Sequence, residues 1–513
     1  MSSLGNLRSR LFIKKSVDGI SAEADSHGLR RHLGRMNLLL LGVGCIIGAG
    51  IYVMSGNAAA NYAGPGVIFS FILAGFACGF TALCYAELAS TIPVSGSSYT
   101  YCYTAMGEVF AWTLGWLLML EYGLAASALS VGLSGYVTSL LGQFGLNIPD
   151  YLSSATVQSV MGNEGMEFIV TPAFNLVAVV AIFIISMVLI AGIAASAMVN
   201  NILVVIKVTV LIGFVLVAFD AVDMANFSPM VPENEGGFRY GWEGVLRASS
   251  TLFFAYLGFE TVSTAASEAK NPQRDMPFGI IGALIFCTVI YMLVVAVMVG
   301  VVPYKELGVP DPIALVVDSL GRPEFAALIK IGAIAGLSSV LLVNAYGQSR
   351  ISFTMSRDGL LPGIFGKLHK KHKTPYIGTI LLGIISAVAA ALFPISLLAD
   401  FVSLGTGLAF SIVCLSTMWL RTNRPNLDRP FRVPLGGVVI KGFWFGYIPC
   451  AGIIMCFIMI GPVLFDIIDR AVKGEVIPAA FLSVYMLIGV YIYIAYGFNN
   501  SRLSKTIKQE NTL

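Results

Sequence analysis

The chain has 513 residues, of which 57% are hydrophobic and 12% are charged, and its formal net charge is +3. Soluble domains usually carry about 25% charged residues, so this composition excludes an ordinary soluble enzyme or binding module. Apolar runs of about 20 residues recur along the whole sequence, and each is long enough to cross a bilayer core about 30 Å thick. A membrane barrel would show short alternating segments instead. The sequence therefore predicts an all-α polytopic membrane protein.

The apolar runs predict twelve transmembrane helices in one transmembrane domain that spans residues 37–500. In chain order the helices are expected at 37–60, 66–92, 108–138, 173–192, 197–219, 244–267, 278–302, 326–350, 376–393, 396–420, 444–466 and 477–497. Residues 1–36 begin with a polar, basic stretch that lacks a signal-peptide core and a cleavage site. We therefore expect residues 1–36 and 501–513 to be terminal tails.

The basic residues predict the orientation of these helices. One side carries seven lysines and arginines in the N-terminal tail, two in 268–277, six in 350–375, five in 421–443 and three in the C-terminal tail. These are 23 of the 31 in the chain. Because the more basic loops stay in the cytoplasm, both termini are predicted to be cytoplasmic in a multi-pass protein of the cell membrane.

The sequence contains no motif for metal binding, nucleotide binding or an ion-selective pore. The eight cysteines lie in or beside apolar segments without metal-ligand spacing, and the four histidines, including His27 and His32, fall in basic loops. The sequence contains no phosphate-binding GxxxxGK[ST] loop and no TVGYG pore signature. We therefore expect no catalytic residues, metal, cofactor or nucleic-acid partner, and neither an enzyme nor an ATP-driven pump.

Three basic residues lie within predicted helices. Arg247 and Lys330 are near the outer ends of their spans, where their side chains are expected to snorkel to the interface. Lys207 lies at the centre of NNILVVIKVTVLIGFV, where a lysine costs roughly 2.5–3.5 kcal/mol on insertion scales. On the outer side, the mildly amphipathic loop 139–172 is expected to form a short surface helix.

Two predicted helices contain features that interrupt a helix. The first includes GVGCIIGAGIYVMSG, and the sixth includes FFAYLGFETVSTAASEAKNP, with Gly258 and Glu260 in mid-span. Glycine permits unwinding, and irregular backbone at membrane depth survives where it lines a cavity or is buried in protein. Its free N–H groups suit a carboxylate and its free C=O groups suit an ammonium, so the pair suits an α-amino acid. The alternative is that the glycines only let helices pack closely.

Four stretches carry a resemblance to a known family. CIIGAGIY, FFAYLGFETVSTAASEAKNPQRDMP, GQSRISFTMSRDGLLP and RPNLDRPFRVPL resemble the amino acid–polyamine–organocation (APC) superfamily, and within it bacterial members of the cationic amino acid transporter family. The resemblance implies a LeuT-type fold with inverted repeats over 37–219 and 244–420, discontinuous helices 1 and 6, and two further helices over 444–497. It also implies secondary active transport of amino acids by alternating access.

The resemblance assigns a binding site at the two interruptions. The substrate carboxylate is expected to meet the backbone of Ile47, Gly48, Ala49 and Gly50. The amino group is expected to meet carbonyls of Ile46, Phe254, Ala255 and Leu257, with Phe254 also closing the outer side. Glu260 stands where relatives often have aspartate, which leaves its partner open.

Lys207 is placed like a helix-5 lysine whose ammonium takes the place of sodium in proton-coupled members of the superfamily. Its expected partners are carbonyls between Gly44 and Ile47 and a hydroxyl of Ser338 or Ser339. Burial can lower the pKa of a lysine by up to 3–5 units, which suits proton coupling. The alternative is a permanently charged lysine that only holds helix 1.

Glu121 and Asn344 are candidates for contact with the substrate side chain. Glu121 lies in mid-membrane in GWLLMLEYGLAAS, where it can face a cationic side chain, act through water on a neutral one, or be protonated and packed. Asn344 in SVLLVNAYGQS suits a long or polar substrate such as arginine, or makes an interhelical hydrogen bond. Asp400, with Ser403 and Thr406, is a candidate for the outer gate.

These patterns favour proton-coupled amino acid symport, with cationic amino acids as possible substrates. Obligate exchange, of an amino acid against its decarboxylated amine or of arginine against ornithine, stays open, and counterflow would reveal it. A sensor that binds without flux is a third class that no feature of the chain supports. Besides the substrate, protons and the bilayer, a small single-helix membrane protein is a possible partner.

Overall fold

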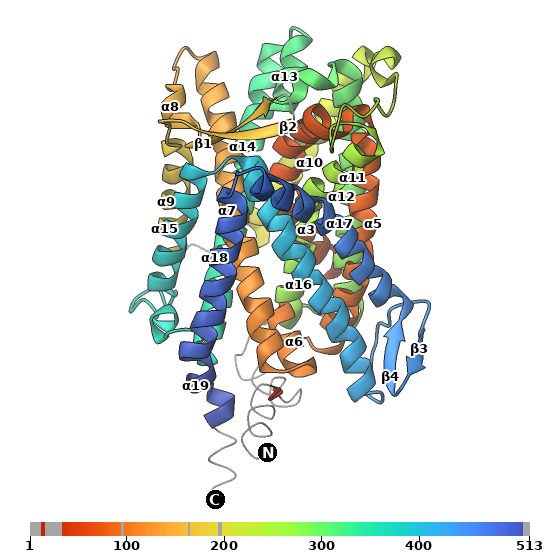
Figure 1. Ribbon diagram of the computed structural model, residues 1–513, viewed down its shortest axis with the longest axis vertical. Helices are drawn as coiled ribbons and strands as arrows, with labels where there is room; N and C mark the ends of the chain where they lie inside the picture. Colours follow the sequence, from red (N-terminus) through yellow and green to blue (C-terminus); the bar gives the residue numbers. More distant parts are fainter. Residues whose placement is uncertain (1–11, 16–32, 94–96, 163–164, 193–196, 506–513) are drawn as a thin grey trace, which may run out of the picture.

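The computed structural model describes residues 12–15, 33–93, 97–162, 165–192 and 197–505, and most of them are helical (Figure 1). The expectations for residues 1–11 and 16–32 of the N-terminal tail, including His27 and His32, and for 506–513 lie outside the described residues. Within the described residues, eight helical stretches are long and apolar enough to span a membrane, and three more apolar helices are shorter. The twelve-helix count stays a prediction.

The first half of the chain forms these helices: α3 (Arg35–Ile46), α4 (Ser55–Ala58), α5 (Val67–Thr91), α6 (Ser97–Ala105), α7 (Glu108–Gln143), α8 (Asp150–Ser153), α9 (Leu176–Ile190), α10 (Ala197–Ala218) and α11 (Gly241–Leu252). The second half forms α12 (Pro272–Val301), α13 (Pro312–Ser319), α14 (Pro323–Arg357), α15 (Tyr376–Leu392), α16 (Ile395–Asn423), α17 (Tyr447–Val472), α18 (Ile477–Ile492) and α19 (Phe498–Asn500). Several of these extend beyond the predicted spans, and α14 continues seven residues further than expected.

Both interrupted helices are broken as the glycines suggest. After α3, Ile47 has an extended backbone (φ −71°, ψ 97°), and the chain becomes helical again in the π-helix η1 (Gly50–Met54). After α11 comes the 3-10 turn η6 (Phe253–Tyr256), and Gly258 then has φ 120°, a value that glycine adopts without strain. The chain continues as the 3-10 helix η7 (Phe259–Glu268).

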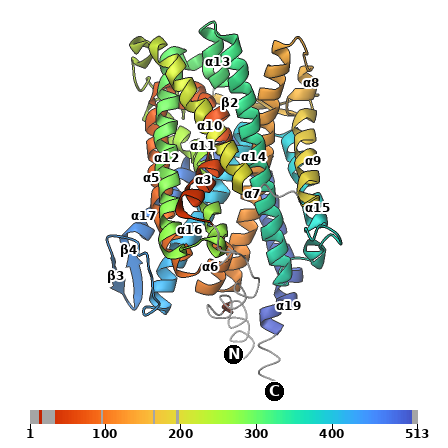
Figure 2. The ribbon, with the colours of Figure 1, turned by 180° about the vertical axis from the view of Figure 1, so that it is seen from behind.

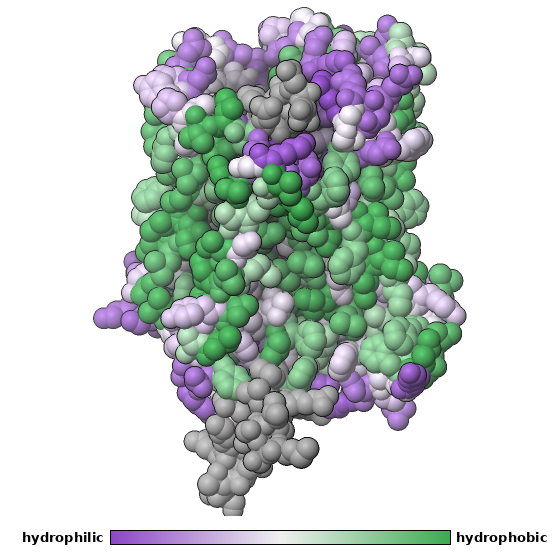
Figure 3. All heavy atoms as spheres, in the orientation of Figure 1, coloured by the Kyte–Doolittle hydropathy of each residue, from purple (hydrophilic) through white to green (hydrophobic). Residues whose placement is uncertain are grey.

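Burial separates central helices from peripheral ones. The most apolar part of α16 is 83% buried inside the protein. The most apolar part of the helical stretch Ile477–Lys505, which begins with α18, is only 11% buried. α18 lies on the outside of the bundle in Figure 1, and α16 packs against α7 and α17. Apolar side chains cover the middle of the molecule and polar ones gather at its two ends (Figure 3), as a membrane protein requires.

The two ends of the bundle carry different small elements. One end of the bundle carries α13, the antiparallel hairpin β1 (Val157–Gly162) and β2 (Gly165–Val170), and α8, which packs against α9. The expectation of one surface helix in 139–172 is therefore wrong for most of the loop. α8 has only four residues, because the sequence after it alternates and favours strands. At the opposite end, the hairpin β3 (Gly437–Ile440) and β4 (Phe443–Gly446) lies near the end of α16, with α6 and α19 at the same end.

Candidate functional site

The two helix breaks lie against each other. A Cβ built on Gly50 would collide with the Cα and Cβ atoms of Ala255, and one built on Gly258 would lie 2.6 Å from the carbonyl carbon of Cys45. Backbone contacts this close exclude any larger residue without a shift of one helix. The glycines therefore bring together the unwound backbone of both segments, which are about 200 residues apart in sequence.

The first break leaves backbone donors free. The Ile47 N–H donates to the Val43 carbonyl at 3.0 Å, and the Gly48 carbonyl accepts from the N–H groups of Ile51 and Tyr52, both at 3.3 Å. In the described part of the chain, the N–H groups of Gly48 and Ala49 donate to no backbone carbonyl. These groups start the second half of the helix, where the partial positive charge favours an anion.

The second break supplies acceptors, and a tyrosine joins them to the first break. The hydroxyl of Tyr291 on α12 lies 2.8 Å from the Ile46 carbonyl and 3.2 Å from the Ala255 carbonyl. Each carbonyl oxygen has two lone pairs, so it can accept another hydrogen bond beside the tyrosine. Among the predicted ligands, the Phe254 carbonyl already accepts from the Leu257 N–H at 3.2 Å.

Sequence reasoning missed Tyr291, although a signal was present. It interrupts the apolar run TVIYMLVV, and a buried tyrosine hydroxyl normally needs a hydrogen-bond partner. The tyrosine is fully buried, so the partner had to be a neighbouring helix.

Lys207 is fully buried on α10 and reaches the end of α3. Its Nζ donates to the Gly44 carbonyl at 2.8 Å and lies 3.3 Å from the Ile47 carbonyl. Both acceptors belong to the predicted range, at the C-terminal end of α3, where carbonyls lack helical partners and favour a cation. These contacts explain how the helix tolerates a lysine at this depth.

The α14 side of Lys207 differs from the expectation. No hydrogen bond joins Lys207 to Ser338 or Ser339 in the described residues. Instead the aliphatic part of the Lys207 side chain packs against Gly336. A Cβ added to Gly336 would lie 3.2 Å from the Cγ of Lys207. The hydroxyls lie further along α14, so the approach of the lysine depends on a glycine rather than on a serine.

Glu260 binds to its own half-helix. Its Oε2 accepts from the Gly258 N–H at 2.8 Å, and its Oε1 accepts from the Thr261 hydroxyl at 3.3 Å. The carboxylate therefore caps the start of η7, where free N–H groups and the helix dipole favour a negative charge. This contact identifies the partner that the sequence left open.

Glu121 and Asn344 have unequal surroundings. Glu121 is fully buried on α7, and neither carboxyl oxygen has a hydrogen-bond partner among the described residues. Asn344 is half-buried, and its Nδ2 donates to the Val340 carbonyl of its own helix at 3.0 Å. The interhelical hydrogen bond considered for Asn344 is therefore replaced by a bond within α14.

Arg247 forms a network that the sequence analysis did not predict. Its guanidinium donates to Asp400 at 2.9 and 2.5 Å and to Asp466 at 3.2 Å. Asp466 also pairs with Arg470 at 3.1 Å. The network joins α11, which leads into the second break, to α16 and α17. Ser403, in contrast, makes no hydrogen bond through its hydroxyl in the described residues.

The expectation that Arg247 and Lys330 snorkel is wrong. Arg247 is 1% exposed and Lys330 is 2% exposed, and Lys330 lies 3.3 Å from Asp318 and 3.8 Å from Asp311. Acidic partners on neighbouring elements, which no local sequence window can show, keep both charges inside.

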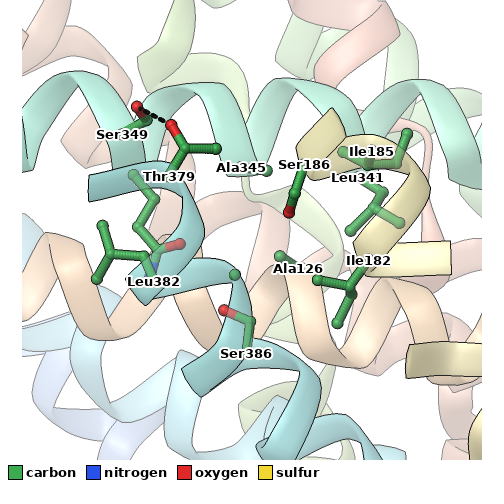
Figure 4. A pocket seen from close by; sticks show the side chains of 12 residues that line it. Ala126, Ile182, Ile185, Ser186, Leu341, Ala345, Ser349, Thr379, Leu382 and Ser386 are labelled. Carbon is green, nitrogen blue, oxygen red and sulfur yellow. Dashed lines mark hydrogen bonds between the residues drawn. The ribbon is translucent and has the colours of Figure 1, made fainter. Parts of the chain in front are cut away.

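A separate small cavity lies between α7, α9, α14 and α15 (Figure 4). Its volume is about 10 Å³, enough for about one water molecule and too small for an amino acid. Ser349 and Thr379 hydrogen-bond to each other at 2.9 Å in its wall, and the Ser386 hydroxyl also lines it. None of the predicted site residues lines this cavity.

Comparison with known proteins shows the family to which this chain belongs. Residues 33–495 match the family described as amino acid permease. The chain is 43% identical to the methylthioribose transporter of Bacillus subtilis (strain 168), over 84% of this chain and 90% of the relative. It is 42% identical to the branched-chain amino acid permease BcaP of the same organism, over 97% and 100%. It is 37% identical to the vacuolar cationic amino acid transporter 2 of Arabidopsis thaliana, over 83% and 65%.

Proposed function

We propose a transport cycle for this chain, which belongs to the amino acid permease family within the APC superfamily. It is a transporter and not an enzyme. We infer that it moves L-amino acids into the cell by alternating access, with a LeuT-type arrangement of twelve helices. The observation that carries this proposal is the contact of two broken helices, one with free N–H groups and the other with carbonyls, around Gly50 and Ala255.

In this proposal the substrate main chain lies between the breaks. Its carboxylate accepts from the N–H groups near Gly48 and Ala49, within the predicted stretch Ile47–Gly50. Its ammonium donates to the carbonyls of Ile46 and Ala255, with Phe254 and Leu257 beside them. An α-amino acid binds to the N–H donors and to the carbonyl acceptors at once. A simple amine binds only to the carbonyls, and a simple carboxylate binds only to the N–H groups. Phe254 and the α11 segment then close the outer side.

The proposed coupling residue is Lys207. Its ammonium holds the Gly44 and Ile47 carbonyls, one of which lies within the unwound backbone that binds the substrate. Loss of the proton removes the positive charge from the end of α3 and weakens the hydrogen bonds there. A change of protonation at Lys207 is thus transmitted directly to Ile47. The proposal is that a proton enters with the substrate and leaves Lys207 on the cytoplasmic side.

The orientation and layout of the proposal follow the basic loops. Residues 1–36 and 501–513 are cytoplasmic tails, and 37–500 form one domain with repeats over 37–219 and 244–420 and helices over 444–497. A small single-helix partner would bind the lipid-facing surface. These assignments complete the model of a permease in the cell membrane.

The substrate side chain is proposed to lie near Glu121 and Asn344. A buried carboxyl with no partner among the described residues suits a cationic side chain, as the name of the plant relative suggests. The name of the bacterial BcaP relative instead suggests branched-chain substrates. The methylthioribose transporter shows that similar chains also serve other solutes. We therefore propose amino acids as the class and test cationic against neutral side chains.

The test is uptake into proteoliposomes without sodium, with and without an inward proton gradient. The panel contains radiolabelled arginine, lysine, alanine and leucine. Accumulation above equilibrium that needs the gradient supports symport and identifies the side chain. Uptake only after internal preloading with amino acid supports exchange, the second candidate. No uptake of any amino acid under either condition would overturn the proposal.

A further inference from the structure

A basic groove opens at the end of the molecule that carries α6 and α19, far from the helix breaks. It has a volume of about 380 Å³ and lies between the last turn of α16, the loop after it, and the β3–β4 hairpin. Three arginines line it, Arg421, Arg429 and Arg432, together with Trp444 and Thr422. The predicted substrate and coupling residues are absent from its lining.

The positive charge of this groove is only partly neutralised. The buried Glu87 accepts from Arg421, with one contact at 2.8 Å, and lies 3.6 Å from Arg429. One carboxylate therefore serves two guanidinium groups. Arg432 is exposed, and no hydrogen bond or ion pair joins it to another residue of the described chain.

The pKa of Arg429 reflects this excess of charge. Burial lowers its pKa, Glu87 opposes the effect, and the neighbouring Arg421 and Arg432 lower the pKa further. A bound anion would relieve the repulsion among the three arginines. Guanidinium groups also match the geometry of phosphate oxygens, with which they make paired, charge-assisted hydrogen bonds.

The other wall of the groove is apolar and faces outward. Val439, which lines the groove, is 68% exposed, and its neighbour Ile440 is 53% exposed. The guanidinium of Arg421 stacks over the ring of Trp444, 4.2 Å from its centroid. In Figure 3 the apolar surface continues towards this corner of the molecule, at the lower right. A tryptophan and apolar side chains beside arginines are typical of the border between acyl chains and headgroups.

We propose that this groove binds the phosphate headgroup of an anionic phospholipid, with the acyl chains against the β3–β4 hairpin. Arg432 supplies the free guanidinium, while Arg421 and Arg429 hold the groove open through Glu87. The exposed apolar wall favours a lipid over a soluble phosphate, because a soluble anion gains nothing from Val439 and Ile440. Basic pockets at the cytoplasmic ends of membrane helices bind lipid headgroups in this way.

The test measures lipid binding to the purified full-length protein by native mass spectrometry, without any transport step. The probes are phosphatidylglycerol, phosphatidylcholine and inorganic phosphate. Arg432→Gln is expected to weaken phosphatidylglycerol binding about tenfold, because a charge-assisted hydrogen bond is lost. Arg274→Gln, at an exposed arginine at the start of α12, is the matched control and should change nothing. Val439→Asn should weaken lipid binding but not phosphate binding.

Three results would overturn the proposal. One is binding of phosphatidylglycerol to Arg432→Gln as tightly as to the wild type. Another is equal affinity for phosphatidylcholine and phosphatidylglycerol. The third is displacement of the lipid by inorganic phosphate at equal concentration, which would identify a soluble anion as the ligand. Because uptake is not measured, these outcomes are independent of the transport proposal.

Discussion

The ion-pair network of Arg247, Asp400 and Asp466 leads to a quantitative prediction. Asp400→Asn keeps the shape of the side chain but removes the charge that Arg247 contacts at 2.9 and 2.5 Å. Removal of one partner from a buried ion pair costs about 3–5 kcal/mol, because the other charge stays buried. Asp466 lies 3.2 Å from Arg247 and compensates in part, so we expect the lower end, about 3 kcal/mol of unfolding free energy.

The matched control is Asp466→Asn. It leaves both Asp400 contacts in place and removes the more exposed carboxylate, which pairs with Arg247 and Arg470, so we expect a loss of about 1 kcal/mol. Arg247→Met combined with Asp400→Asn should cost less than the sum of the single changes, because neither then leaves an unpaired charge.

The assay uses the cysteines of the protein. Seven of the eight free cysteines are buried, so a thiol-reactive fluorophore labels the chain mainly after unfolding. Titration with sodium dodecyl sulfate in mixed micelles then gives the unfolding free energy. A loss of less than about 0.5 kcal/mol for Asp400→Asn would refute the reasoning, since that is the range of surface substitutions. An Asp466→Asn effect larger than that of Asp400→Asn would refute it as well.

Three further variants test the candidate site. Gly50→Ala should abolish uptake because its Cβ collides with Ala255, whereas Gly461→Ala, with open space around it, should leave uptake unchanged; normal uptake by Gly50→Ala would contradict the contact. Tyr291→Phe removes the hydroxyl that holds the Ile46 and Ala255 carbonyls, to which the substrate ammonium is proposed to donate. If this positioning contributes about 1 kcal/mol to substrate binding, KM should rise about fivefold, as measured by radiolabelled uptake at varied substrate concentration. Glu121→Gln should reduce arginine uptake at least about tenfold and spare alanine uptake; equal rates for both substrates would indicate a packed carboxyl.

The sequence predicts the parts of the fold that depend on local chemistry. Apolar length predicts helices, and clustered glycines predict the breaks at Ile47 and Gly258. The carbonyl partners of Lys207 were expected from the resemblance to the superfamily, and the structure has them at Gly44 and Ile47, without the serine hydroxyl that was expected beside them. The remaining expectations about substrate and proton stay predictions.

The parts that the sequence did not predict depend on partners far along the chain. Arg247 meets Asp400 and Asp466, which are more than 150 residues away and belong to two other helices. Tyr291 likewise reaches Ile46 across 245 residues. Hydropathy within a window cannot show such pairs, so Arg247 was expected to snorkel. The β1–β2 hairpin was missed for a different reason: weak alternation in a loop was interpreted as helical amphipathicity.

Proton movement through Lys207 is tested most directly by substrate-induced acidification of sodium-free proteoliposomes that contain a pH-sensitive dye. Lys207→Ala and the longer Lys207→Met are compared with the wild type, using the amino acid that the uptake panel identifies. Counterflow exchange confirms that each variant still binds and turns over substrate. The account predicts that substrate acidifies the lumen for the wild type and not for either variant, while exchange persists. Acidification by both variants at the wild-type rate would contradict it.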